Sequence, residues 1–158
     1  MTTVRRVPLS TLTSGMELAL YIHEIQGVLG DGPTLGVSAA IHGDEPGGTH
    51  MVMEIARRYG GGNFRGRLLL LPVANPLAFE AYSRNTPLDA QNMNRLFPGH
   101  AGGRITEQLV ALITRRVPEH DRRLHRYSHG RPADRRLRLH PQRRRPVTQF
   151  WLPGSIPF

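Results

Sequence analysis

The sequence contains no cysteine and no lysine. The first absence excludes disulfide bonds and thiolate metal sites, so a zinc ion in this protein would have to be bound by His, Asp or Glu. The second leaves arginine to carry every fixed positive side-chain charge, although protein surfaces normally use both basic residues. There is also no run of roughly 20 apolar residues that could cross a bilayer, and no apolar signal core near Arg5 and Arg6. We therefore expect a soluble, cytoplasmic protein without a membrane partner.

Positive charge is abundant, but it is unevenly distributed along the 158 residues. Residues 1–114 carry 9 arginines against 9 acidic residues, whereas residues 115–158 carry 12 arginines against 3. The second segment therefore accounts for the whole net charge of +9. The length and the 39% hydrophobic content suit one domain with a modest core. We place this domain at residues 1–114 and an Arg/His/Pro-rich tail at residues 115–158.

The first 114 residues alternate between strand and helix patterns, which favours an α/β domain. A continuous leucine run indicates a strand that is buried on both faces, and Pro46 suits the first turn of a helix that the following glycines would end. We predict strands at 18–25, 34–41 and 67–74, helices at about 46–59 and 105–113, and a polar functional loop at 75–103. The expected fold is a mixed, mostly parallel sheet flanked by helices.

An imidazole and a carboxylate follow the second predicted strand, at His42 and Glu45. Open α/β sheets build their sites at the carboxyl ends of strands, and both side chains can reach one ion there. Catalytic zinc commonly takes two His and one carboxylate and leaves a position open for water. The spacing alone is weak, because Asp44 or Glu45 beside a helix N-terminus is equally explained as a capping residue without any metal.

A second segment makes the pattern specific. After the leucine-rich strand come Asn75-Pro76, Arg84, Asp89 and then Asn92-Met93-Asn94-Arg95-Leu96-Phe97-Pro98-Gly99. Together with Ile41-His42-Gly43-Asp44-Glu45, these ordered motifs resemble the succinylglutamate desuccinylase/aspartoacylase family, over roughly residues 17–114. The resemblance implies a zinc carboxypeptidase-like fold.

The resemblance also implies roles for individual residues. His42 and Glu45 would bind one zinc ion, and Arg84 would polarise the scissile carbonyl as the catalytic arginine. Asn94 and Arg95 would bind the carboxylate of the substrate, a role that suits the bidentate geometry of a guanidinium group. We expect Asp89 to order the loop by pairing with an arginine or with backbone amides. The implied activity is zinc-dependent deacylation of small N-acylated, amino-acid-like carboxylates.

The tail departs from the family pattern. The family's third ligand is a His in an Asp-Leu-His-Thr-Gly type motif beyond Phe97-Pro98-Gly99, and its general base is a later Glu. Neither motif is present as written, and the nearest histidines are His120, His125 and His129 among arginines. We hypothesise that the tail is an out-of-frame translation entered near Thr114 or Arg115, since codons compatible with residues 119–130 can spell a strand ending in Asp-Ile-His-Thr when read one base later. The chain would then be a truncated and inactive enzyme.

Two other functions remain open. A zinc carboxypeptidase acting on peptides would share the fold and the ligands. A basic arm, disordered until it meets nucleic acid, would explain the arginines differently, although only Tyr127 could offer base stacking within the Arg-rich stretch. An accidental arginine tail would bind nucleic acid only non-specifically and at low salt.

Overall fold

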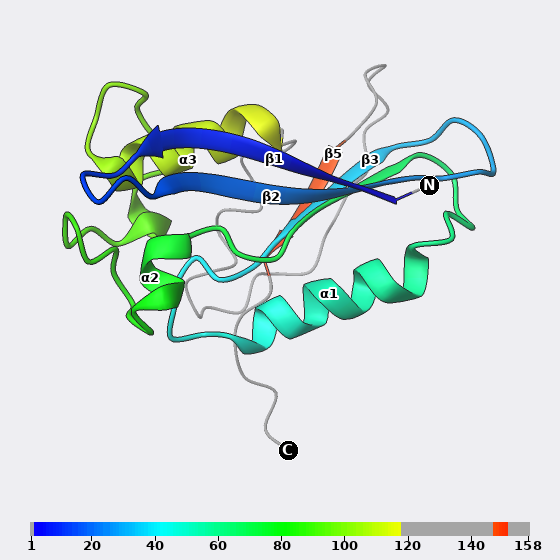
Figure 1. The fold of residues 1–158 in the computed structure, drawn as a ribbon. Coiled ribbons are helices and arrows are strands. Elements are labelled where there is room, and N and C mark those ends of the chain that lie inside the picture. Colours follow the sequence, from blue (N-terminus) through cyan, green and yellow to red (C-terminus); the bar gives the residue numbers. More distant parts are fainter. Residues whose placement is uncertain (1, 118–146, 152–158) are drawn as a thin grey trace, which may run out of the picture.

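The computed structural model describes residues 2–117 and 147–151, and for the second range it defines the backbone alone. These residues form one sheet with helices on its faces (Figure 1). The chain order is β1 (Thr2–Thr11), β2 (Glu17–Gln26), β3 (Thr34–Ser38), α1 (Gly47–Tyr59), β4 (Arg67–Leu71), α2 (Pro76–Glu80), the 3-10 helix η1 (Met93–Arg95), α3 (Ile105–Arg116) and β5 (Val147–Trp151).

The five strands lie in the order β1-β2-β4-β3-β5. The pairings of β2 with β1 and with β4 are antiparallel, whereas β3 pairs in parallel with β4 and with β5. The sheet is therefore mixed, with equal numbers of parallel and antiparallel pairings among the described strands. As predicted, the leucine-rich strand β4 is central, and Leu69, Leu70 and Leu71 are each at most 2% exposed.

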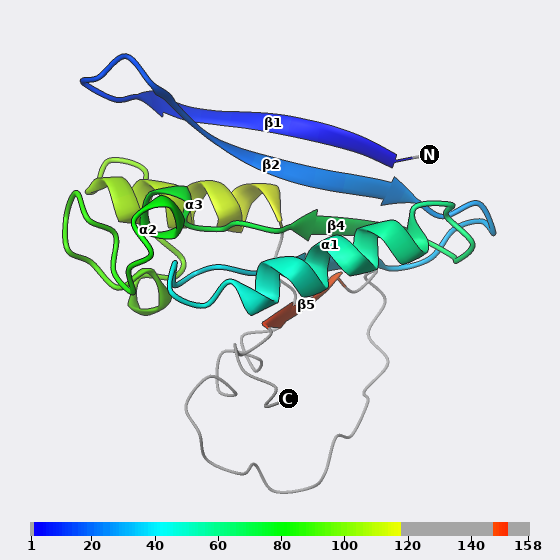
Figure 2. The same ribbon diagram turned by 60° about the horizontal axis from the view of Figure 1, so that its bottom comes forward.

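The alternation of side chains along β4 divides the core into two layers. Leu69 and Leu71 pack with α3 residues such as Leu109 and Ile113 on one face. Leu68 and Leu70 pack against α1 on the other face, around Val52. Figure 1 and Figure 2 show α1 and α3 as separate helices along the sheet. Packing of helices on both faces holds the ends of the strands in place, and the polar loops begin at these ends.

Most predicted elements are confirmed, with shifted ends. The strand predicted at 34–41 stops at Ser38, and the strand predicted at 67–74 stops at Leu71. After each of these residues the chain leaves the sheet and forms a loop. The 75–103 loop contains two short helices, α2 and η1, which the sequence analysis did not predict. The edge strand β1 was also missed, since only Val7 of its ten residues is fully buried. None of the described helices is long and apolar enough to span a membrane.

Candidate metal and substrate site

The first part of the site is built where β3 and β4 end side by side. Both strands finish at the same edge, since Ser38 pairs with Leu71. The two chains then continue together through backbone hydrogen bonds from Ala74 N to Ala39 O at 2.8 Å and from Asn75 N to Ala40 O at 3.0 Å. The parallel pairing thus places His42 and Asn75, which come from distant parts of the sequence, on one edge of the sheet.

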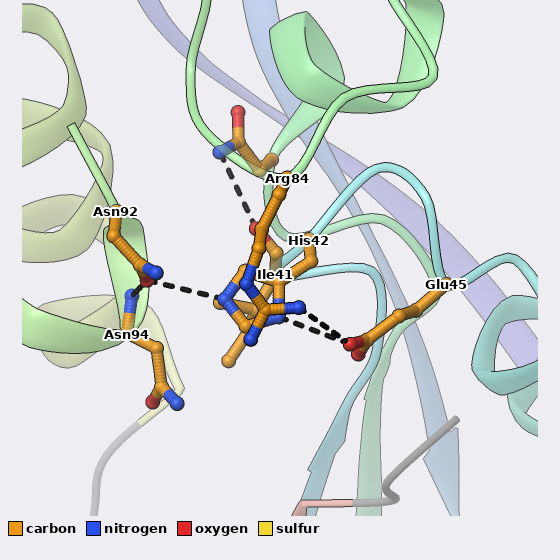
Figure 3. Close-up of polar contacts among 7 residues, drawn as sticks. Ile41, His42, Glu45, Arg84, Asn92 and Asn94 are labelled. Atoms are coloured by element: carbon orange, nitrogen blue, oxygen red, sulfur yellow. Dashed lines mark hydrogen bonds and ion pairs between the residues drawn. The ribbon is translucent and has the colours of Figure 1, made fainter. Parts of the chain in front are cut away.

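His42 and Glu45 point toward one another across a tight turn (Figure 3). The Glu45 amide donates to the His42 carbonyl at 3.3 Å, and the His42 Nδ1 atom lies 3.3 Å from Glu45 Oε1. The side chain of His42 is only 7% exposed, whereas the side chain of Glu45 is 38% exposed. The pair therefore presents one buried nitrogen and one more accessible oxygen to a common point.

Asn92 fixes which ring nitrogen of His42 carries the proton. The Asn94 amide donates to Asn92 Oδ1 at 3.1 Å, so this side-chain atom must be the oxygen. The same oxygen lies 3.1 Å from His42 Nε2, and because it can only accept, Nε2 must donate. In neutral imidazole the Nδ1 lone pair then faces the carboxylate of Glu45. In this tautomer, Nδ1 and Glu45 Oε1 can both offer lone pairs to one cation.

Gly43 allows the turn that carries His42 and Glu45, called the ligand turn below, to pack closely against α2. The Gly43 amide donates to the Ser83 carbonyl at 2.8 Å. A Cβ atom at Gly43 would lie 1.8 Å from the carbonyl oxygen of Ala78, closer than any real contact. Only glycine permits this approach of two backbones, and the approach fixes the position of His42 relative to the segment that carries Arg84.

The side chain of Asn75 links three segments of the chain and is completely buried. Its Oδ1 accepts from the Ala78 amide at 3.2 Å and so caps α2. Its Nδ2 donates to the hydroxyl of Thr86 at 2.9 Å and to the Ile41 carbonyl at 3.4 Å. One amide group therefore connects the metal-ligand turn, α2 and the loop that follows Arg84.

Arg84 brings a positive charge to the same turn. Its Nη1 donates to Glu45 Oε1 at 3.2 Å, and its side chain is 55% exposed. Figure 3 shows the side chain of Arg84 reaching toward the carboxylate of Glu45. The arginine predicted to be catalytic thus contacts one of the two predicted metal ligands directly.

Asp89 attaches the loop around it to the start of α3. Its carboxylate accepts from the hydroxyl of Thr106 at 2.6 Å, from the Thr106 amide at 2.9 Å and from the Gln91 amide at 3.2 Å. The Thr106 amide belongs to the first turn of α3, where a negative charge is favourable. The expectation that Asp89 orders the loop through backbone amides is confirmed.

A family model described as the succinylglutamate desuccinylase/aspartoacylase catalytic domain matches residues 31–145. The chain belongs to this family. The match includes the ligand turn and the whole loop described above, and it extends beyond the predicted domain boundary at residue 114. That boundary stays a prediction.

Several relatives of this desuccinylase/aspartoacylase chain are known. It is 36% identical over 106 residues to an N-alpha-acetyl-L-2,4-diaminobutyric acid deacetylase from Halomonas elongata, an alignment that covers 66% of this chain and 31% of the deacetylase. An aspartoacylase family protein from Mesorhizobium loti superposes with a TM-score of 0.66 at 28% identity, covering 73% of this chain and 36% of that one.

The product-bound structure of the ectoine utilization protein EutE (DoeB) from Ruegeria pomeroyi superposes with a TM-score of 0.64 at 30% identity, with 73% and 36% of the two chains covered. These structures confirm the expected carboxypeptidase-like fold. The chain spans about a third of the length of these relatives.

The structure places the sequence-predicted residues of this family member in two groups. His42, Glu45 and Arg84 are in direct contact through Glu45 Oε1. Asn94 lies close by in η1, with its backbone bonded to Asn92, while Arg95 in the same helix is exposed. Asn92, which the sequence analysis left without a role, contacts His42 directly, and only its place inside the Asn-x-Asn-Arg motif could have drawn attention to it.

Within residues 2–117 and 147–151, the structure contains no group of three or more His, Asp or Glu side chains that could hold a metal ion. His120, His125 and His129, the nearest histidines considered as a third ligand, lie outside the described residues. The described part of the site therefore supplies two candidate metal ligands, together with the residues that hold them in position.

An apolar cavity of about 490 Å³ lies elsewhere, between α1 and the first residues of β3 and β4. Its lining is mostly apolar, with Leu35, Ile55 and Phe64, and it also includes Arg65 and Arg67. None of the predicted site residues lines it, so this cavity is separate from the polar turn around His42.

Proposed function

We propose that this chain carries the N-terminal part of the active site of a zinc-dependent deacylase, which hydrolyses the amide bond of small N-acylated amino acids. The observation that carries the proposal is the convergence of His42 Nδ1 and Glu45 Oε1 at 3.3 Å. Two ligand atoms of a tetrahedral zinc ion, with bonds of about 2.1 Å, lie about 3.4 Å apart. The distance between the two atoms therefore suits coordination of one zinc ion.

The surroundings of His42 support this assignment. A metal-binding imidazole usually donates its other ring N–H to an oxygen, which fixes the ring and the tautomer. The oxygen of Asn92 provides that acceptor here at 3.1 Å. Burial of the imidazole keeps water from competing for the ring nitrogens, while the partial exposure of Glu45 leaves a route for the ion and the substrate.

The zinc ion, when bound, would supply a Lewis acid and a water of lowered pKa. Arg84 would stabilise the negative charge that develops on the carbonyl oxygen of the scissile amide. Asn94 and Arg95 would bind the carboxylate of the amino-acid part, for which Arg95 is exposed and within the same short helix. Each of these roles concerns a group whose position in the chain matches the family motif.

The substrate class follows from the relatives. The Halomonas elongata protein is named for removing an acetyl group from N-alpha-acetyl-L-2,4-diaminobutyric acid. Its similarity over two thirds of this chain makes N-acetylated amino acids with a free carboxylate the first substrates to test. A site that binds carboxylate through arginine would also accept N-acyl amino acids with other side chains.

Turnover requires groups that the matched motifs do not provide. A third ligand and a general base are both missing from the family positions in the sequence as written, and loss of a general base alone typically lowers the rate by about 10² to 10⁴. The chain as it stands should therefore bind zinc weakly and turn over little or no substrate. The reading-frame hypothesis predicts that both functions return together.

Zinc binding by the purified chain tests the proposal first. We expect His42→Ala and Glu45→Ala each to abolish measurable zinc binding, because either change leaves a single described ligand. Wild-type binding that both variants retain would contradict the site.

Hydrolysis provides the second test. Sequencing the gene through codons 110–140 shows whether the shifted frame can encode Asp-x-His-Thr. If it does, the corrected protein should hydrolyse N-acetyl-L-2,4-diaminobutyrate and similar N-acetyl amino acids faster than dipeptides. A preference for dipeptides would instead indicate a carboxypeptidase.

A further inference from the structure

One oxygen atom of Glu45 has two partners. Oε1 lies 3.3 Å from His42 Nδ1 and accepts a hydrogen bond from Arg84 Nη1 at 3.2 Å (Figure 3). A zinc ion bound between His42 and Glu45 would coordinate through this same oxygen. The guanidinium group of Arg84 therefore occupies the oxygen that the metal needs.

The geometry points to Arg84 as a residue that metal binding releases: zinc and the Arg84 guanidinium compete for Glu45 Oε1, and the arginine becomes free to bind substrate only when the metal displaces it. This inference rests on the proposed function. It adds an order of binding, metal before substrate, and a second role for Arg84 before the substrate arrives.

Electrostatics favours displacement over sharing. A divalent cation at Oε1 repels a guanidinium group held within hydrogen-bond distance of the same atom. Donation from Arg84 also reduces the electron density that Oε1 can offer to a metal. Since the ion pair is largely exposed, water screens it and keeps it weak enough for a metal to replace.

The loop around Arg84 allows its side chain to move while the backbone stays in place. The backbone of Ser83 is bonded on both sides, to the Gly43 amide at 2.8 Å and to the Ala78 carbonyl at 3.0 Å. The side chain of Arg84 itself is 55% exposed, and Glu45 is its one polar partner among the described residues. A rotation about the side-chain bonds is therefore enough to turn the guanidinium from Glu45 toward a bound carbonyl.

Competition has a thermodynamic consequence. If the metal frees Arg84 to contact the scissile carbonyl, then the metal raises the affinity of the site for substrate, and by linkage the substrate raises the affinity for the metal. Without the metal, Arg84 pairs with Glu45 and is not available to the carbonyl oxygen. The residue thus prevents productive substrate binding until the site is loaded.

The experiment measures zinc affinity by competition with a fluorescent chelator, for the wild-type chain, Arg84→Gln and Arg95→Gln. Removing Arg84 should tighten zinc binding by about two- to fivefold, the range that an exposed ion pair of this kind is worth. Arg95→Gln removes the same charge from the same loop without removing a partner of Glu45, so its zinc affinity should stay close to that of the wild type.

Each result decides a different claim. Equal or weaker zinc binding by Arg84→Gln, with a wild type that binds zinc, overturns the competition. Equal tightening in both variants also overturns it, because the effect is then one of overall charge. If the wild-type chain binds no zinc at all, the proposed function itself fails.

A spectroscopic readout follows the arginine directly. In ¹⁵N-labelled protein, the side-chain Nε signal of Arg84 should shift when zinc is added, and the shift should saturate with the same zinc dependence as the His42 ring signals. An Arg84 signal that stays unchanged while the His42 signals saturate would show that arginine and metal share Glu45, and would overturn the inference.

Discussion

The contact between Gly43 and α2 gives the sharpest test of how the ligand turn is positioned. A Cβ atom at residue 43 would lie 1.8 Å from Ala78 O, 2.1 Å from Ala78 C and 2.5 Å from Phe79 N. Ordinary van der Waals contact begins at 3.4 Å, so α2 would have to move by about 1.6 Å in Gly43→Ala. All three atoms belong to the backbone, and no side-chain rotation can relieve the clash.

The cost of Gly43→Ala can be estimated from its parts. Overpacking of this kind costs about 1–3 kcal/mol, and moving α2 would also break the hydrogen bond from the Gly43 amide to Ser83, which is worth about 1 kcal/mol. We expect the free energy of unfolding to fall by about 2–4 kcal/mol. At about 2–4 °C per kcal/mol for a chain of this size, the melting temperature should fall by roughly 4–16 °C.

Gly47→Ala is the matched control, because it adds the same methyl group four residues further along the chain. Nothing lies within 4 Å of a Cβ atom at Gly47, which is the first residue of α1. Alanine there should leave stability unchanged or raise it by up to about 1 kcal/mol. Thermal and urea unfolding followed by circular dichroism measure both variants. A Gly43→Ala protein as stable as Gly47→Ala would refute the close packing of the ligand turn on α2.

Three further changes test individual contacts. Asn92→Ala removes the acceptor of the His42 Nε2 proton and should lower zinc affinity by about 10- to 100-fold in a chelator competition, since it leaves the ring free to change tautomer. Thr106→Val removes the hydroxyl that donates to Asp89 and should lower the free energy of unfolding in urea by about 1.5–3 kcal/mol, the value of a hydrogen bond to a charged group. The hydrogen bond from Arg57 lowers the pKa of Glu54. The pair therefore stabilises the fold at pH values above the ordinary glutamate pKa, and this contribution is lost as the pH falls through the lowered pKa of Glu54. In Arg57→Ala, an NMR titration should find the pKa of Glu54 back near its ordinary value.

The sequence was informative wherever local chemistry determines structure. The four leucines 68–71 predicted a buried strand, and β4 is the central strand of the sheet. The turn that carries His42 and Glu45 was predicted at a strand end, and the structure brings their side chains together there. The family resemblance supplied the link to Arg84, which no periodicity could have given.

Contacts between distant segments were beyond the reach of the sequence. Asn92 lies 50 residues from His42, and nothing in the spacing distinguishes it from Asn94, to which the resemblance gave the functional role. The strand β1 was missed because Pro8 and two adjacent arginines obscure its alternation, and an edge strand buries few side chains. The pairing of β5 with β3 was also not predicted. The apolar segment at residues 150–152 is short, and its sequence carries no pattern that identifies a partner strand.

The most direct test of the metal site is a ¹⁵N NMR titration of the histidine ring nitrogens with zinc. We predict that His42 Nδ1 shifts on zinc addition while Nε2 keeps its proton and its coupling to hydrogen, because Asn92 holds that proton. A zinc-induced shift at Nε2, or no response of His42 at zinc concentrations that saturate the protein, would contradict the proposed site.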